Sequence, residues 1–188
     1  MIFKRKEISE EEIKHNAEEA MVKGSAEAFQ ILYNNYAQKV YRFCLRMLGE
    51  EENANDAFQE VFVRIYENRH QFKGDNFGAW LFTIARNTCL NYIRTKKEQT
   101  SFDESYHHKS DDNEKMDFST KEQIEKAIAE LPVPMREALL LREYEDMSYQ
   151  EIAETLGIEL SLAKVRVHRA RLILRKILKP LVKELNES

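Results

Sequence analysis

Apolar residues recur at steps of three and four along much of this chain, and that spacing restricts it to helices. One run contains Phe29, Leu32, Tyr36, Val40, Phe43 and Met47, and Gly49 follows it. Another run extends from Ala163 to Leu181 with the same steps. Side chains at this spacing share one face of an α-helix. The 188 residues include only 5 glycines and 3 prolines, too few for the many turns of a β-sandwich or barrel. The sequence therefore predicts an all-α protein.

The predicted helices fall into two groups separated by an acidic segment. The first group covers 29–48, 54–68 and 80–92, with a loop from Phe72 to Gly78, and the second covers 121–131, 135–144, 148–156 and 161–181. Residues 98–120 carry seven acidic and two basic residues and show no apolar period, as is typical of a flexible linker. We predict two small helical domains, residues 1–97 and 121–188, joined by a linker at 98–120.

Three further features indicate a cytoplasmic protein that does not enter a membrane. No apolar run approaches the ~18 residues needed to cross a bilayer. The segment from Met1 to Glu7 lacks the apolar core of a secretory signal. Cys44 and Cys89 both lie among apolar residues of predicted helices, which favours two buried thiols over a disulfide.

The segment from Ser148 to Arg171 has the pattern of a helix-turn-helix. Ser148 and Glu151 form a capping box at the start of its first helix. Gly157 permits the left-handed turn that ends this helix, and Ser161 is the predicted N-cap of the second helix. The second helix of such a motif presents polar side chains near its N-terminus to the base edges of duplex DNA.

Charge is unevenly distributed along the chain. The formal net charge of −4 alone would argue against nucleic acid, yet residues 164–183 contain eight Lys and Arg and no acidic residue. Local basic patches matter more than the total, because phosphate contacts are local. Residues placed to reach base edges are Lys164, Val165, His168 and Arg169, and residues placed to reach phosphates are Arg166 and Arg171. Ser161 is also predicted to contact DNA. A plain helical hairpin with a solvated basic face is the alternative.

Three sequence strings occur in a fixed order along the chain. Asn55-Asp-Ala-Phe-Gln-Glu-Val-Phe62 precedes Phe77-Gly-Ala-Trp-Leu-Phe-Thr-Ile-Ala-Arg-Asn87, and Arg166-Val-His-Arg-Ala-Arg171 lies within the helix-turn-helix. Over residues 20–180, this order resembles the extracytoplasmic-function sigma factors, the small promoter-recognition subunits of bacterial RNA polymerase. The resemblance implies a helical region 2, a helix-turn-helix region 4, and promoter-specific transcription initiation with core RNA polymerase and without a cofactor.

The resemblance also implies roles for residues of region 2. Asp56, Gln59 and Glu60 would dock on a coiled coil of the largest polymerase subunit. The single-stranded minus-ten element would be read by the loop and helix that follow, through Lys73, Asn76, Phe77, Arg86, Asn87, Asn91 and Arg94. Trp80 is predicted to lie in the core rather than to stack on a base. A cognate anti-sigma factor is usual in the family.

One segment departs from the family pattern. Family members usually carry Gly-Thr-Val before the recognition helix, where this chain has Ser161-Leu-Ala163. Leu162 offers no hydroxyl to a phosphate or base, and Val165 stands where polar residues are common. The minus-thirty-five sequence that the chain prefers is therefore left open.

Other functions explain less of the sequence. A stand-alone helix-turn-helix regulator that binds duplex DNA would leave the region 2 strings unexplained. An enzyme is disfavoured because the sequence has no Gly-rich phosphate loop and no nucleophile with a base partner. A metal site at His107, His108, Asp111 and Asp112 would lack groups that orient its ligands. A membrane-surface helix at 163–183 is disfavoured because its apolar stripe has no Trp or Phe.

Overall fold

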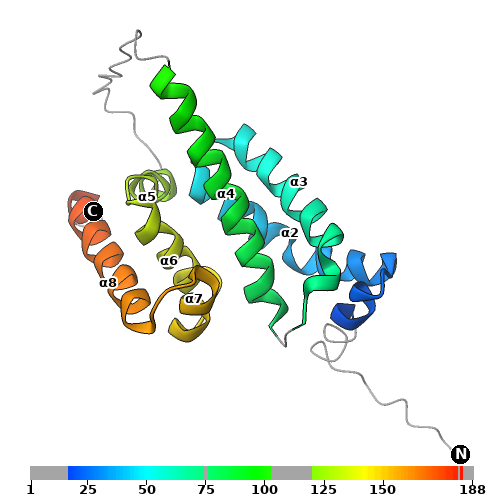
Figure 1. Cartoon of the computed structure of the whole chain (residues 1–188). Coiled ribbons are helices and arrows are strands. Elements are labelled where there is room, and N and C mark those ends of the chain that lie inside the picture. The colour runs from blue at the N-terminus through cyan, green and yellow to red at the C-terminus, as the bar shows by residue number, and fades with distance from the viewer. Residues whose placement is uncertain (1–16, 74–75, 103–119, 182, 184–188) are drawn as a thin grey trace, which may run out of the picture.

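The chain is helical throughout its regular structure, within the residues that the structure describes. In this computed structural model they are residues 17–73, 76–102, 120–181 and 183. Residues 17–22 are helical. The elements that follow are α2 (Ala26–Leu48), α3 (Glu51–Glu67), the short 3-10 turn η1 (Arg69–Gln71), α4 (Phe77–Phe102), α5 (Thr120–Ala129), α6 (Val133–Glu143), α7 (Tyr149–Leu156) and α8 (Leu160–Ile177) (Figure 1). The predicted all-α class is confirmed.

Helices α2, α3 and α4 pack into the predicted bundle, here called the N-terminal unit. Their apolar faces meet in a core where the rings of Phe43 and Phe82 lie 5.4 Å apart. Ser25 begins α2, and its hydroxyl accepts from the backbone N–H of Ala28 at 3.2 Å. Gly49 ends the helix in the left-handed conformation, with φ of 75°, which glycine adopts without a Cβ clash. The short-range signals in the sequence therefore fix both ends of α2.

Helices α5 to α8 form the C-terminal unit, in which α7 and α8 are the predicted helix-turn-helix. The backbone N–H of Glu151 donates to the Ser148 hydroxyl (3.2 Å), and the N–H of Ser148 donates to the Glu151 carboxylate (2.7 Å), so the capping box is present. Gly157 ends α7 with φ of 63°. The N–H of Ile158 then bonds to the carbonyl of Ala153 (2.9 Å), which closes the turn before α8. The helix-turn-helix prediction is confirmed.

The start of α8 differs from the prediction. The helix begins at Leu160 with Glu159 as its N-cap, so Ser161 lies inside the first turn and the predicted Ser161 cap is wrong. The backbone N–H of Ala163 already bonds to the Glu159 carbonyl at 3.0 Å. The tight turn at Ile158 is the physical reason, because it lets the backbone become helical before Ser161 is reached.

Helix α4 runs into the segment predicted as linker. It continues past residue 97 to Phe102, because the intervening residues include no glycine or proline and Lys96 pairs with Glu50, the residue that precedes α3. The remainder of the predicted linker, residues 103–119, lies outside the described residues.

The two units are packed against each other. Helix α4 contacts α7, and α2 contacts α5 and α6 (Figure 1). Arg136 of α6 donates to the backbone carbonyl of Met47 in α2 at 2.7 Å. Buried apolar side chains of both units also form one continuous core. We call this the docked arrangement, and it determines which functional side chains are exposed.

Cys44 of α2 and Cys89 of α4 are buried free thiols, as predicted. A hydrogen bond with Cys44, together with burial, raises the pKa of the Cys89 thiol well above its usual value. Because the thiolate is the reactive form, this raised pKa suppresses the reactivity of Cys89. Among the described residues, no helix combines the length and the apolar character that crossing a membrane requires.

Candidate nucleic-acid and polymerase interfaces

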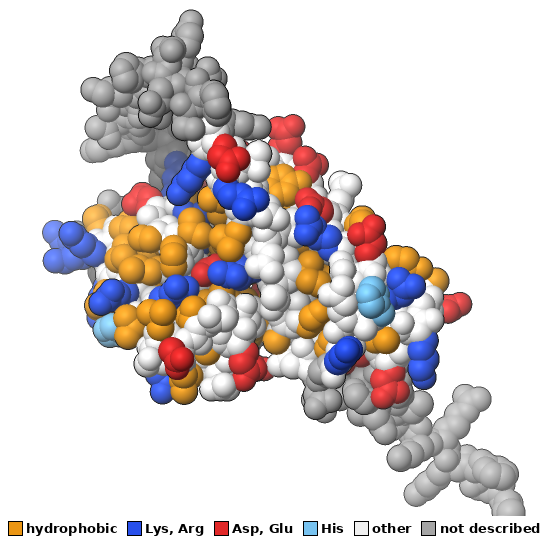
Figure 2. All heavy atoms as spheres, viewed as in Figure 1, with side chains coloured by type: hydrophobic (Ala, Val, Ile, Leu, Met, Phe, Trp, Pro, Cys, Tyr) orange, Lys and Arg blue, Asp and Glu red, His pale blue; other side chains and the backbone are white. Residues whose placement is uncertain are grey.

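Helix α8 presents a polar and basic face on the side opposite to its buried one. Its buried residues, Ala163, Val167 and Ala170, are three and four apart and pack into the core. The predicted base-reading residues lie on other sides of the helix and are all exposed, namely Lys164, Val165, His168 and Arg169. Helix α8 contains no acidic residue. Figure 2 shows basic and apolar side chains gathered together on this flank of the molecule.

Two predicted phosphate contacts of α8 are held by carboxylates of α6. Arg166 donates from Nη1 to Oε1 of Glu137 (3.1 Å), and Arg171 donates from Nε to Oε1 of Glu143 (2.9 Å). Glu137 is buried, whereas the Glu143 pair is exposed. The sequence did not reveal these pairs, because each partner lies on a separate helix. Ser161 is exposed in the first turn.

Glu137 also holds an arginine of the N-terminal unit. Arg86 of α4 donates from Nε to Oε2 of Glu137 at 2.7 Å, so one buried carboxylate bridges Arg86 and Arg166. Guanidinium groups bind carboxylates and phosphates with the same paired geometry. The docked arrangement thus uses two arginines that were predicted to contact DNA. The sequence did contain one sign that Glu137 is buried. Leu140 and Leu141, three and four residues after Glu137, share its face of α6, so Glu137 is a charged residue on an apolar face.

The side chains predicted to read single-stranded DNA are spaced along α4. Asn87, Asn91 and Arg94 are exposed at steps of four and three, and Lys73 is exposed before the helix. The Asn87 amide oxygen accepts from Arg86 Nη1 at 3.2 Å. Asn91 borders a groove of about 500 Å³ between α3 and α4. Amides on such a face can donate to and accept from the edge of an unpaired base.

The residues at the start of α4 make contacts that the sequence did not predict. Asn76 caps α4 by accepting from the backbone N–H three residues later (2.9 Å), and its amide donates to Glu151 of α7 (2.5 Å). Phe77, predicted as a DNA contact, is only 2% exposed, and its ring lies 5.5 Å from that of Tyr36. The prediction for Phe77 is corrected, because the first residue of α4 faces the core, where its ring also lies 5.4 Å from that of Phe72. Trp80 is partly buried and packs against the core, with its ring 5.6 Å from that of Phe77.

A second buried carboxylate, Glu145, lies between α6 and α7 and packs against α2. Its side chain is 5% exposed, and Lys39 Nζ lies 3.8 Å from its Oε2. Burial raises the pKa of Glu145 to about 7, although the charges of Lys39 and Arg46 act in the opposite direction. Together with Asn76, it borders a cavity of about 250 Å³ between the units. Glu145 therefore changes charge near neutral pH inside the contact between the units.

Raising the pH from 5 to 8 should loosen the docked arrangement. Glu145 has a pKa of about 7 when docked and 4.5 as an ordinary glutamate, so the docked form binds the proton more tightly. The favourable free energy that this proton linkage adds to docking is fully present below pH 4.5 and is lost as the pH rises through about 7. Lys39, Arg42 and Arg46 of α2 and the adjacent Asp146 act on the same carboxyl group. Small-angle X-ray scattering should show expansion of the wild type but not of Glu145→Gln, and an unchanged pH response in that variant would contradict the assignment.

The three residues predicted to contact core polymerase lie on one side of α3. Asp56 and Gln59 are exposed, and the Glu60 carboxylate accepts from Arg64 Nε at 2.7 Å. Val63 continues this side and is 55% exposed. The exposure of Val63 was not predicted, because it directly follows the apolar residues Val61 and Phe62 and so resembles a core residue. Carboxylates beside an exposed apolar group suit a basic and partly apolar protein partner.

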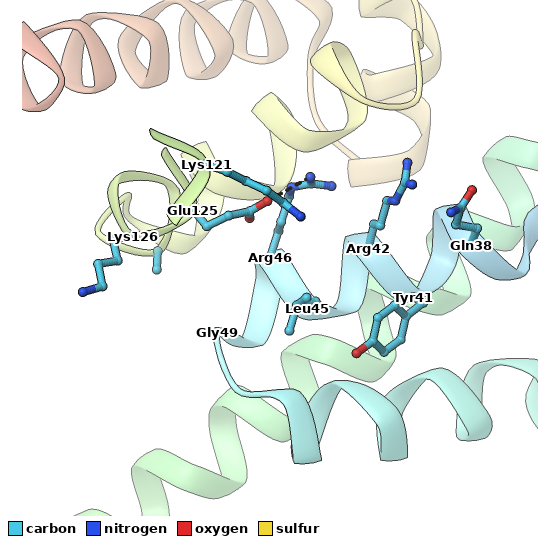
Figure 3. Close-up of a pocket in the computed structure, with 10 residues that line it drawn as sticks. Gln38, Tyr41, Arg42, Leu45, Arg46, Gly49, Lys121, Glu125 and Lys126 are labelled. Carbon is cyan, nitrogen blue, oxygen red and sulfur yellow. Dashed lines mark hydrogen bonds and ion pairs between the residues drawn. The ribbon is translucent and has the colours of Figure 1, made fainter. Parts of the chain in front are cut away.

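A groove of about 690 Å³ marks the seam between α2 and α5. Figure 3 shows Arg46 reaching from α2 toward Glu125 of α5, and the two side chains pair at 3.0 Å. The Arg46 guanidinium also lies 3.8 Å from the centre of the Tyr144 ring, in a cation–π contact. These contacts fasten the C-terminal unit to α2.

The structure offers no metal centre within the part of the chain that it describes. No three His, Cys, Asp or Glu side chains are grouped there to hold a metal ion. The histidines and aspartates considered from the sequence, within 107–112, lie outside the described residues.

Two segments of the chain match known protein families. Residues 32–99 match Sigma-70 region 2, and residues 121–174 match Sigma-70, region 4. The RNA polymerase sigma-H factor of Pseudomonas aeruginosa is 30% identical over 181 residues, which cover 88% of this chain and 94% of the relative. The ECF RNA polymerase sigma factor SigW of Bacillus subtilis is 31% identical over 174 residues, which cover 85% and 93%. The matched segments correspond to the two helical units.

Solved structures share the fold. One is the sigma factor RpoE in complex with the anti-sigma factor NepR from Bartonella quintana, with a TM-score of 0.71, 24% identity, and coverage of 82% of this chain and 98% of that one. Another is CnrH in complex with the cytosolic domain of CnrY, with a TM-score of 0.67, 20% identity, and coverage of 89% and 98%. Both likenesses extend over most of the chain.

Proposed function

Since the chain belongs to the extracytoplasmic-function (ECF) family of RNA polymerase sigma factors, we propose that its two helical units divide promoter recognition between them. An ECF sigma factor binds core RNA polymerase and directs initiation at specific promoters. In the proposed division, the N-terminal unit docks on the polymerase and reads the melted minus-ten element, and the C-terminal unit reads the duplex minus-thirty-five element. One contrast carries this proposal: α4 exposes amides beside its cations, whereas α8 exposes cations and contains neither an amide side chain nor an acidic residue.

The C-terminal unit is suited to duplex DNA. The major groove admits one helix, and each base pair presents a distinct pattern of donors and acceptors there. Lys164 and His168 lie exposed in the first half of α8, and Arg169 is exposed directly after them; the N-terminal part of a recognition helix is the part that reaches base edges. Arg166 and Arg171 would bind phosphates after release from their α6 carboxylates.

The N-terminal unit is suited to an unpaired strand. Asn87 and Asn91 share an exposed face of α4, and their amides can bond to base edges that a duplex would hide. Lys73, Arg86 and Arg94 would hold the backbone phosphates. Asn76 would join them once its bond to Glu151 is broken. In this proposal Phe77 supports the loop and makes no DNA contact.

The proposed function requires the docked arrangement to open. The two promoter elements are nearly two helical turns apart, roughly 70 Å along the duplex, whereas α4 and α7 are in contact. Arg86 and Arg166 share Glu137 and are not available to phosphate while they do so. We infer that core polymerase separates the units, because promoter recognition takes place in that complex.

Further aspects of the function follow from the family. Sigma factors are initiation factors rather than enzymes, and we propose that this chain has no catalytic role and works in the cytoplasm beside the polymerase. The similar RpoE structure is a complex with an anti-sigma factor, so we expect a partner of that class here as well. The alternative function, a stand-alone helix-turn-helix regulator, would leave residues 32–99 without a role.

Mutations in the two units should affect different steps. With core polymerase, Arg169→Ala should weaken duplex promoter binding about 5- to 100-fold, the effect of losing one contact to a base edge. Asn87→Ala should leave duplex binding nearly unchanged and impair strand opening. Duplex binding and permanganate footprinting of the same complexes measure the two steps. On a pre-melted bubble template, the remaining Asn87→Ala defect reports the lost base contact alone.

Matched variants control for the loss of a polar side chain. Arg175→Ala removes an exposed arginine six residues further along α8, and Asn34→Ala removes an exposed asparagine of α2. Both should behave as the wild type in base recognition. Asn87→Ala could instead reduce duplex binding as much as Arg169→Ala and leave the melting of bound complexes unchanged. That result would contradict the assignment of Asn87 to single-stranded DNA.

A further inference from the structure

Two aliphatic side chains lie exposed on the recognition helix among its cations. Leu162 is 41% exposed and Val165 is 40% exposed, although α8 has a separate buried side that packs into the core. The two residues are three apart near the start of α8, so they are neighbours on its surface. They are the same residues that depart from the polar pattern usual at these positions. Two adjacent aliphatic side chains at this exposure can be buried further by contact with a partner.

The charge around the pair indicates which partner that is. Lys164, His168 and Arg169 are exposed within one or two turns of it, and α8 has no acidic residue. Figure 2 shows the resulting mixture of basic and apolar side chains on this flank. The exposed carboxylate of Glu159 precedes Leu162 by three residues, so Lys164 and Arg169 flank the pair toward the C-terminal side. An apolar pair beside such cations is complementary to a polyanion with an apolar group in its groove. Duplex DNA has one such group in the major groove, the 5-methyl group of thymine.

We propose that Leu162 and Val165 recognise thymine methyl groups in the upstream promoter element, an inference that rests on the proposed assignment of α8 to duplex DNA. Burying a methyl group against an aliphatic side chain removes both from water. One buried methyl contributes about fourfold in affinity, from ~0.8 kcal/mol per group. Cytosine lacks this methyl group, so the contact discriminates between pyrimidines. The departure from the family pattern thus becomes a determinant of promoter choice.

Helix geometry limits where these thymines lie. At about 1.5 Å per residue, Leu162 and Val165 are separated by about 4.5 Å along α8, and Arg169 lies about 6 Å further on. Base pairs are stacked about 3.4 Å apart. The contacted thymines should therefore lie within about two base pairs of each other. A guanine read by Arg169 should lie within about two base pairs of the thymine at Val165 and about three of the thymine at Leu162, since arginine binds the O6 and N7 atoms of guanine.

The test uses holoenzyme assembled from core polymerase and the full chain. Promoters are first selected from a duplex library in which both elements are randomised, and then remade with deoxyuridine in place of each upstream thymidine. Deoxyuridine removes only the methyl group. The wild type should lose about fourfold in binding for each contacted methyl. Leu162→Ala and Val165→Ala should bind thymidine promoters more weakly and should each lose the thymidine–deoxyuridine difference at one position.

Leu172→Ala is the matched control. Leu172 is an aliphatic residue of α8 with 47% exposure, but it lies seven residues beyond Val165, outside the half of the helix that reaches base edges. This variant should keep the full deoxyuridine penalty. Equal binding of both promoters by the wild type, or an undiminished penalty in both alanine variants, would overturn the proposal. Weaker binding of core polymerase without DNA by Leu162→Ala would also overturn it, because the pair would then belong to a protein interface. Selected promoters whose binding is insensitive to Arg169→Ala would overturn the assignment of α8 itself.

Discussion

Replacing Asp56 and Glu60 together by arginine should nearly abolish binding to core RNA polymerase and leave the helical bundle folded. Both residues lie on the side of α3 away from its buried core residues. Charge reversal at a complementary interface costs several kcal/mol, which corresponds to a loss of at least about 100-fold. Folding loses the half-buried pair between Glu60 and Arg64, about 0.3–0.5 kcal/mol for such a helix pair, and the side-chain hydrogen bond between Glu60 and Tyr92.

The measurement is the affinity of the double variant for core polymerase, with helix content and thermal unfolding recorded on the same preparation. Glu51→Arg with Glu130→Arg is the matched control, because both carboxylates are exposed and the change in net charge is identical. The control should bind as the wild type does. Val63→Ala should weaken binding by a smaller factor, since it shortens an apolar side chain next to the charges. Wild-type affinity in a folded Asp56→Arg, Glu60→Arg variant would place the polymerase contact elsewhere.

Local interactions explain why most helix boundaries could be predicted from the sequence. Gly49 ends α2, and Ser148 with Glu151 begins α7, through contacts between residues at most four apart. Such signals are complete within a short stretch of sequence. The exposed face of α8 could be predicted for the same reason, because Ala163, Val167 and Ala170 mark its buried side.

Contacts between distant segments explain what the sequence did not reveal. Glu137 pairs with arginines that are 51 and 29 residues away, and no local pattern links them. Phe77 was assigned to DNA by resemblance, yet it is buried because α4 begins against α2. Which cations are available to DNA therefore depends on how the two units dock. The residues of the candidate site could be predicted one by one. That some of them are bound to carboxylates or buried in the docked arrangement depends on tertiary structure, which the sequence did not reveal.

Glu137→Gln should open the docked arrangement and raise the affinity of the free chain for duplex DNA. The substitution keeps the side-chain shape but leaves Arg86 and Arg166 without their shared negative charge in a buried position. Breaking a buried ion pair from one side costs about 3–5 kcal/mol. Part of that loss falls on the contact between the units, so the chain should expand in small-angle X-ray scattering. Both arginines then become available to phosphate, and duplex binding without polymerase should rise about tenfold or more.

Two further variants separate opening from the mere release of an arginine. Glu143→Gln frees Arg171 of α8 from α6 within the C-terminal unit and should leave the scattering profile unchanged. Arg86→Ala breaks only the link between the units and preserves the pair between Glu137 and Arg166, so it should expand the chain without unfolding the helix-turn-helix. If Glu137→Gln and Arg86→Ala expand the chain but Glu143→Gln does not, then the ion pair between Glu137 and Arg86 holds the two units together. If all three variants scatter as the wild type does, the apolar core shared by the units holds them together, and the carboxylate merely neutralises two arginines.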